Sequence, residues 1–127
     1  MKKIIVTGGL GFIGSNLIDL LLKKGHTVVN LDKISYSSNF YNTKSFKKNK
    51  KYRFIKIDIN SSKISKIFDK IKPDCIFNLA AESHVDRSIE SPKPFIQSNI
   101  VGVFNLLEAF RKYSKNKKKI KFIHIST

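Results

Sequence analysis

The sequence predicts an α/β fold: a parallel, doubly wound sheet of five strands with flanking helices. Two observations predict it. Short apolar segments alternate with amphipathic ones along the 127 residues, and strands joined by helices are parallel. The chain also opens with an apolar segment, a glycine-rich turn and a helix in direct succession, which is typical of the first unit of a dinucleotide-binding domain.

The expected elements follow from hydrophobic periodicity and turn residues. Strands are expected at 2–7, 27–31, 52–57, 75–79 and 120–126. The first helix should start near Ser15 and end at Gly25, the second has its apolar face at Ile64, Ile67, Phe68 and Ile71, and the third spans 92–113. Residues 33–51 are expected to form a long surface loop with room for a helical turn, and 80–91 a polar loop. The third helix has apolar residues on more than one face, which favours contact with a partner subunit.

The glycines of the first turn each have a predicted task. Gly8 allows the tight turn off the strand, Gly11 lets a pyrophosphate approach the backbone, and Gly14 lets the helix pack closely on the strand. The helix N-terminus then offers free N–H groups and a positive dipole end to phosphates. The alternative is an ordinary strand-to-helix turn of a flavodoxin-like domain.

Asp32 ends the second predicted strand, 18 residues after Gly14. This is close to the interval of about 20 residues expected for a carboxylate that binds the adenosine ribose. Such a carboxylate accepts from the 2′-hydroxyl and repels a 2′-phosphate, which favours NAD over NADP. The adjacent Lys33 could partly offset that repulsion.

Charge raises a competing hypothesis. The net charge is +16, as in many nucleic-acid binders. However, the lysines are scattered over predicted loops and solvent faces, and no predicted helix carries a basic stripe with interleaved aromatic residues. We therefore expect no nucleic-acid partner, although a positive field would attract an anionic nucleotide substrate.

Composition limits the remaining classes. Hydrophobic residues make up 41% of the chain, which indicates a globular protein. No apolar run approaches the roughly 20 residues needed to span a bilayer, so no membrane association is expected. The single cysteine, Cys75, excludes an internal disulfide and a cysteine zinc cluster, and it is expected to be an inert buried thiol. A cytoplasmic protein without a metal site is the resulting expectation.

The chain ends on the carboxyl end of a predicted strand, where ligands bind in such folds. We therefore expect residues 1–127 to be an incomplete Rossmann domain, the N-terminal piece of a longer protein with its catalytic helix and substrate domain downstream.

Five stretches carry a resemblance to a known family: 7–15 (TGGLGFIGS), 31–39 (LDKISYSSN), 79–89 (LAAESHVDRSI), 95–102 (FIQSNIVG) and 122–127 (FIHIST). The first resembles extended short-chain dehydrogenases/reductases generally. Together, and most specifically through 80–89, they resemble the dTDP-glucose 4,6-dehydratases within that family. The match covers essentially the whole chain.

The resemblance implies roles for individual positions. Ser83 would also reach the sugar nucleotide, and Thr127 would contact the hexose. The implied NAD-binding residues are Gly8, Gly11, Phe12, Ile13, Gly14, Asp32, Lys33, Ile34, Ser35, Asp58, Ile59, Leu79, Ala80, Ala81, Glu82, Ser83 and Ser98.

The resemblance also implies what the whole enzyme does. It would convert dTDP-glucose to the 4-keto-6-deoxy sugar as a homodimer, through a tightly held NAD that accepts and returns a hydride. The family's catalytic Asp-Glu pair and Tyr-x-x-x-Lys helix follow the strand that ends at Thr127, so no catalytic residue is expected in this chain, which should be inactive alone. A sister nucleotide-sugar 4-epimerase or dehydratase, and a non-catalytic nucleotide-binding module, are the alternatives.

Several polar residues have a second interpretation. Asp58 could simply cap the next helix. The side chains of Glu82, Asp86 and Arg87 could form a solvated loop network. His84 is more readily structural or substrate-positioning than a proton carrier.

Overall fold

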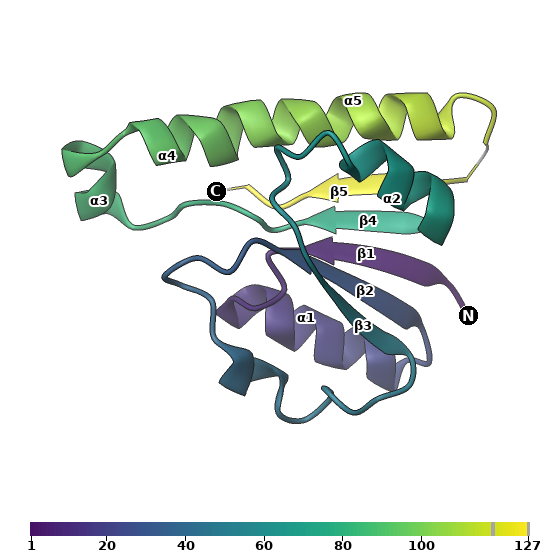
Figure 1. Cartoon of the computed structure of the whole chain (residues 1–127). Helices are drawn as coiled ribbons and strands as arrows, with labels where there is room; N and C mark the ends of the chain where they lie inside the picture. The colour runs from purple at the N-terminus through teal and green to yellow at the C-terminus, as the bar shows by residue number, and fades with distance from the viewer. Residues whose placement is uncertain (118, 127) are drawn as a thin grey trace.

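The computed structural model describes residues 1–117 and 119–126, and within them five parallel strands form one sheet (Figure 1). The order across the sheet is β3-β2-β1-β4-β5. The strands are β1 (Lys3–Thr7), β2 (Thr27–Asp32), β3 (Tyr52–Lys56), β4 (Cys75–Asn78) and β5 (Lys121–His124). The predicted fold class is confirmed.

β1 lies at the centre of the sheet. Its last residue, Thr7, is in register with Leu31 of β2 on one side and Asn78 of β4 on the other. The chain builds the sheet outward from β1 to β3 and then returns to the other side of β1 to add β4 and β5. Ligands bind beyond the carboxyl ends of the strands at such a reversal of strand order.

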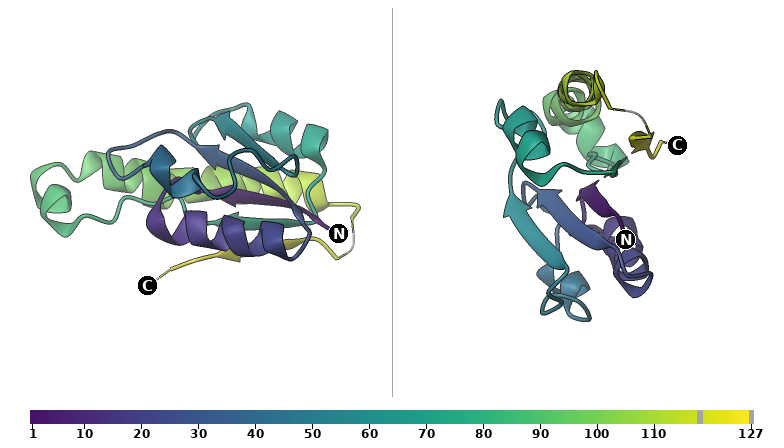
Figure 2. Two further views of the ribbon diagram at one scale, coloured as in Figure 1. Left: turned by 90° about the horizontal axis from the view of Figure 1, so that it is seen from below. Right: turned by 90° about the vertical axis from the view of Figure 1, so that its right-hand side faces the viewer.

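Helices cover both faces of the sheet (Figure 2). On one face, α1 (Phe12–Lys23) packs Ile18, Leu21 and Leu22 against the side of β1 that carries Ile4 and Val6. On the other, α2 (Ile64–Ile71) and α5 (Gly102–Ser114) pack against Ile5 of β1 and its neighbours. The alternation of Ile4, Ile5 and Val6 between two cores explains why the central strand is apolar throughout.

The first helix begins three residues earlier than predicted. Gly11 is its N-cap, with an extended backbone, and the Ser15 N–H already donates to the Gly11 carbonyl at 3.0 Å. The sequence prediction relied on the apolar positions that pack on the sheet. These positions begin only after Phe12 and Ile13, whose side chains are exposed. Consequently the first turn of α1, rather than a loop, presents its amides to the end of the sheet.

The segment predicted as a polar loop at 80–91 contains a short helix, α3 (Val85–Glu90), so that prediction is corrected. No residue of α3 is buried, which explains why hydrophobic periodicity gave no signal for it. Similarly, the predicted 92–113 helix is continuous but not regular. It consists of α4 (Lys93–Ile96), the π-helical turn η2 (Gln97–Val101) and α5.

β5 is shorter than the strand predicted at 120–126, and α1 ends at Lys23, shortly before the predicted Gly25. The 33–51 connection contains one 3₁₀ turn, η1 (Phe40–Thr43). Cys75 is buried at the start of β4, and burial raises the pKa of its thiol more than the nearby Lys2 and Lys121 lower it. A buried thiol of raised pKa is a poor nucleophile.

Candidate functional site

A cleft of about 1000 Å³ lies beyond the carboxyl ends of the strands. In Figure 1 this is the left end of the sheet, where the arrowheads of β1, β4 and β5 point. Its walls come from segments far apart in the sequence: the glycine turn, the loops after β2, β3 and β4, the turn η2, and the end of β5. Of the residues predicted to bind the cofactor, it is lined by Gly8, Gly11, Phe12, Ile13, Gly14, Asp32, Lys33, Ser35, Asp58, Ile59, Leu79, Ala80, Ala81, Glu82, Ser83 and Ser98.

The glycine turn runs from the end of β1 into α1. Gly8 has φ +71°, in the left-handed region that favours glycine. Its N–H donates to the Leu31 carbonyl of β2 at 2.9 Å, and its own carbonyl accepts from the Gly11 N–H at 3.2 Å. These two bonds close the turn and point the start of α1 at the cleft. The first amides of α1, at Phe12, Ile13 and Gly14, have no intrahelical acceptor and are free for an anion.

Two glycines of the turn differ in what surrounds them. A Cβ on Gly14 would lie 2.3 Å from the Gly8 carbonyl oxygen and 2.8 Å from the Gly9 Cα, both backbone atoms. A Cβ on Gly11 would meet only the Gly8 oxygen, at 3.4 Å. Gly14 is therefore needed for the close approach of helix and turn, whereas Gly11 leaves open space on the side of the cleft. That space suits the phosphate group for which the sequence predicted it.

The Asp32 carboxylate accepts hydrogen bonds from the glycine turn and from the loop after β2. Its Oδ2 accepts from the Leu10 N–H at 3.1 Å, and its Oδ1 accepts from the Ile34 N–H at 2.8 Å and the Ser38 hydroxyl at 3.1 Å. The side chain is buried, at 7% exposure. Each carboxylate oxygen can accept about two hydrogen bonds, so Oδ2 keeps one position for a further donor such as a ribose hydroxyl.

Ile34 does not line the cleft, unlike its predicted neighbours. Its φ is +63°, an unusual conformation for a β-branched residue. The bond from its N–H to Asp32 holds it there. The contribution of Ile34 is therefore to turn the backbone after β2, and this geometry gives no role to its side chain in the cleft.

A buried polar chain crosses the strand ends under the cleft. The Ala80 N–H donates to Thr7 Oγ1 at 3.2 Å, so the Thr7 hydroxyl donates onward to Asn78 Oδ1. The Asn78 amide then donates to His124 Nδ1 at 3.0 Å. These hydrogen bonds tie β1, β4 and β5 together where their side chains meet the cleft.

A second set of hydrogen bonds joins the glycine turn to β3 at the edge of the sheet. The Gly9 N–H donates to Asn30 Oδ1 at 3.0 Å, and the Asn30 amide donates to the Tyr52 hydroxyl at 3.1 Å. Asn30 is fully buried in β2. A buried amide with both ends satisfied fixes the turn relative to the sheet.

Lys33 and Glu82 meet across the cleft. Lys33 Nζ lies 3.3 Å from Glu82 Oε1 and donates to Ser98 Oγ at 3.0 Å. Glu82 is in turn fixed by Asn99, whose side-chain amide accepts from the Glu82 N–H and donates to its carbonyl, both at 2.9 Å. Ser98 and Asn99 both lie on η2. A π-helical turn at a functional site is a common way to aim side chains that a regular helix would place elsewhere.

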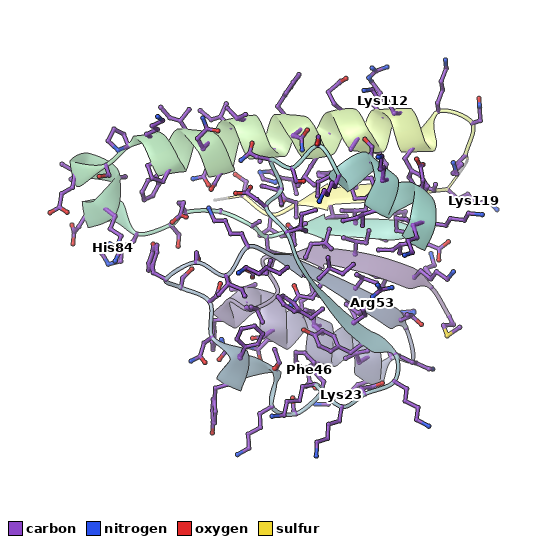
Figure 3. The ribbon with its side chains drawn as sticks, in the orientation of Figure 1. Lys23, Phe46, Arg53, His84, Lys112 and Lys119 are labelled. Atoms are coloured by element: carbon purple, nitrogen blue, oxygen red, sulfur yellow. The ribbon has the colours of Figure 1, made fainter. Side chains whose placement is uncertain are left out.

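A cation–π contact also links the loop after β2 to α3. The Arg87 guanidinium carbon lies 3.8 Å from the centre of the Tyr36 ring, and His84 meets that ring edge-on at 6.3 Å. His84 lies below α3, at the outer end of the molecule (Figure 3). These contacts place both His84 and Arg87 against the Tyr36 ring.

Asp58 does not cap the helix that follows it. Its Oδ1 accepts from the Asn60 N–H at 2.9 Å, and α2 begins only at Ile64, with Lys63 as its N-cap. The adjoining Ile59 carbonyl accepts from the Asn105 side-chain amide of α5. The turn after β3 is thus held against α5 with Asp58 exposed at the wall of the cleft.

Thr127, predicted to contact the hexose, lies outside the described residues. Ser37, Ser38, Asn99 and His124 line the cleft although no role was predicted for them. All four lie within the stretches that carried the family resemblance. Their positions at strand ends and on a helix beside Ser98 were the available signals.

Among residues 1–117 and 119–126, no group of three or more His, Cys, Asp or Glu side chains is placed to hold a metal ion. Within the same ranges, every helix is too short or too polar to cross a membrane.

Comparison with known proteins shows the family to which the chain belongs. The family model described as GDP-mannose 4,6 dehydratase matches residues 5–127, almost the entire chain. The chain belongs to this family. Its curated relatives include the dTDP-glucose 4,6-dehydratases of Salmonella typhimurium, 45% identical over 98% of the chain, and of Escherichia coli, 46% identical over 98%. The chain spans 37% and 36% of the length of these two relatives.

Solved structures of similar proteins agree with this family membership. The dTDP-glucose 4,6-dehydratase of Bacillus anthracis, determined in complex with NAD, superposes with a TM-score of 0.85 at 32% identity, over 100% of this chain and 38% of that one. The UDP-glucose 4-epimerase of Thermotoga maritima gives 0.84 at 35% identity, over 98% and 38%. The resemblance to dTDP-glucose 4,6-dehydratases is confirmed, while the fold of this part is shared with the epimerase.

Proposed function

We propose that this chain is the NAD-binding part of a dTDP-glucose 4,6-dehydratase. The observation that carries the proposal is the cleft in which the open face of Gly11, the free amides of α1 and the buried carboxylate of Asp32 converge. The dehydratases of Salmonella typhimurium and Escherichia coli, at 45% and 46% identity, support the reaction class.

The residues present fit a bound NAD. Gly11 and the first turn of α1 would receive the pyrophosphate, Asp32 the adenosine ribose, Asp58 and Ile59 the adenine, and residues 79–83 the nicotinamide side, with Ser98 also in contact. When bound, NAD supplies the acceptor for a hydride that is later returned to the sugar. The protein's task in this part is to hold the dinucleotide in one orientation and to exclude a 2′-phosphate.

The substrate and the reaction extend the proposal to the whole enzyme. It would take dTDP-glucose, remove water and release the 4-keto-6-deoxy sugar, with Ser83 and Thr127 contributing to the sugar-nucleotide site. An adjacent Asp-Glu pair does not occur in these 127 residues, and the two Tyr-x-x-x-Lys spacings that do occur, at Tyr52–Lys56 and Tyr113–Lys117, precede β5 instead of following it as the family resemblance implies. We therefore expect the 127 residues alone not to turn over substrate. A cytoplasmic location belongs to the same proposal.

Turnover of dTDP-glucose by the product of the complete coding sequence tests this function. We expect formation of a 4-keto-6-deoxy sugar, identified by mass spectrometry as a loss of water. A 4-epimer of unchanged mass would instead establish the sister function, which the similarity to the Thermotoga maritima epimerase favours. Dinucleotide binding without conversion of nucleotide sugars would indicate a non-catalytic nucleotide-binding module.

We also propose that the enzyme is a homodimer that associates through the helix formed by α4, η2 and α5. One face of this helix packs on the sheet and α2, whereas the other exposes large apolar side chains. Phe104 is 65% and Ile100 63% exposed, and Ile96 and Leu107 continue the same stripe at intervals of three and four residues. A second copy of this stripe is the occupant that the family resemblance favours.

A charged residue in the stripe should disrupt this dimer. Phe104→Lys is expected to weaken self-association by at least about 30-fold, since an aromatic anchor at an interface contributes roughly 2 kcal/mol or more. Leu20→Lys, on the exposed side of α1, is the matched control and should leave the dimer intact. Light scattering across a concentration series measures both. A wild-type monomer, or a Phe104→Lys protein that dimerises normally, would reject this interface.

A further inference from the structure

Lys33 poses a problem of specificity in the cleft. It directly follows Asp32, and both residues line the same cavity. A carboxylate at this place favours the ribose 2′-hydroxyl of NAD, whereas a nearby cation accommodates the 2′-phosphate of NADP. The two side chains therefore favour opposite cofactors, and the selectivity of the cleft depends on what occupies the ammonium group.

In the structure the Lys33 ammonium group already has two partners. Lys33 Nζ donates to Ser98 Oγ at 3.0 Å and lies 3.3 Å from Glu82 Oε1. The Glu82 side chain is only 9% exposed and the Lys33 side chain 37%, so water screens this pair less than a pair in which both partners are exposed. Ser98 is buried as well. The Lys33 side chain thus reaches across the cleft to two partners that the rest of the fold holds in place.

Both partners connect to the turn η2. Asn99 makes two hydrogen bonds of 2.9 Å with the backbone of Glu82, and Ser98 is its neighbour on η2. The backbone from which the Glu82 side chain extends is therefore held by η2, independently of Lys33. A fixed backbone lowers the conformational entropy that the pair loses when Lys33 and Glu82 meet.

We infer that Glu82 is a specificity-determining residue, which neutralises Lys33 and so leaves Asp32 to select NAD against NADP. Its carboxylate compensates the one ammonium group beside Asp32 on the 33–38 loop. If the carboxylate is lost, the ammonium is uncompensated and available to a 2′-phosphate. This inference rests on the proposed binding of NAD and concerns only the choice between the two dinucleotides.

The test is the ratio of dissociation constants for NADP⁺ and NAD⁺, measured by calorimetry on nucleotide-free, full-length protein. The two ligands differ only in the 2′-phosphate, so any effect of Glu82 on the nicotinamide half cancels in the ratio. Glu82→Gln keeps the shape of the side chain and removes its charge. We expect it to lower the ratio by about tenfold, the usual magnitude of one hydrogen bond to a charged group.

Two further variants assign the effect. Glu90→Gln removes a carboxylate from the exposed end of α3, outside the cleft, and should leave the ratio unchanged. The double variant Glu82→Gln with Lys33→Met has no ammonium to release, and its ratio should return to at least the wild-type value. Thermal unfolding of each variant shows that it is folded.

The outcomes separate this inference from the proposed function. Wild-type protein that binds neither dinucleotide would overturn the NAD site itself. Wild-type protein that binds NAD⁺, together with a Glu82→Gln ratio within about twofold of wild type, would overturn the role of Glu82 alone. A lowered ratio that persists in the double variant would also overturn it, since the effect would not pass through Lys33.

Discussion

Replacing Gly14 by alanine is expected to cost the protein about 3 kcal/mol of stability and to reduce its affinity for NAD by about 100-fold. The new Cβ would lie 2.3 Å from the Gly8 carbonyl oxygen, a backbone atom that cannot rotate away. The glycine turn must therefore move off α1, which breaks the geometry that presents the amides of Phe12 and Ile13. Thermal unfolding and calorimetric titration with NAD measure the two effects.

Gly11→Ala is the matched control, and it should separate folding from binding. Its Cβ would find only an ordinary contact of 3.4 Å within the protein. We expect less than about 1 kcal/mol of destabilisation, the usual scale for a change at a helix N-cap. Affinity for NAD should still fall by about 100-fold, because the methyl group would occupy the space proposed for the pyrophosphate. A Gly11→Ala protein that binds NAD normally would show that the pyrophosphate lies elsewhere.

Asp32→Ala is expected to have the second large effect, about 3 kcal/mol in stability with a loss of at least about 100-fold in NAD affinity. The substitution leaves the buried N–H group of Leu10, and the partly buried Ile34 N–H and Ser38 hydroxyl, without their acceptor. Both the glycine turn and the loop after β2 would lose their anchor. Denaturant unfolding and NAD titration provide the measurements.

Asparagine should rescue this site only in part. Its single oxygen can replace Oδ1 toward Ile34 and Ser38, but its amide would then face the Leu10 N–H, donor against donor. The control is Asp19→Ala, which removes a carboxylate of α1 whose partners are the exposed Lys23 and, at 3.4 Å, the Ser45 hydroxyl. It should cost less than about 1 kcal/mol. Equal effects of the Asp32 and Asp19 substitutions would contradict the anchoring role of Asp32.

The sequence was sufficient to predict the sheet, its parallel arrangement and the location of the cleft. These features depend on hydrophobic periodicity and on the spacing of Gly8, Gly11, Gly14 and Asp32, which are local properties of the chain. The same spacing correctly placed the turn and the carboxylate on adjacent strands. The cofactor roles of individual residues remain predictions.

The contacts that cross the cleft could not be read from the sequence. The Lys33–Glu82 pair joins residues 49 positions apart and depends on η2, a π-helical turn with no periodic signal of its own. The helix α3 has no buried residue and therefore no apolar periodicity from which it could be predicted. The family resemblance groups Ile34 with its neighbours, and the sequence gives no sign of its left-handed backbone conformation, because that conformation accompanies the contact with Asp32 and not a glycine.

The nucleotide held by the natural protein tests the central claim most directly. Full-length protein, purified without added cofactor, is denatured, and the released small molecules are identified by mass spectrometry. A cleft that holds NAD as a prosthetic group predicts about one NAD per polypeptide. Recovery of NADP would contradict the selectivity assigned to Asp32. If no dinucleotide is released and the protein fails to bind added NAD, the cleft is not the site that we propose.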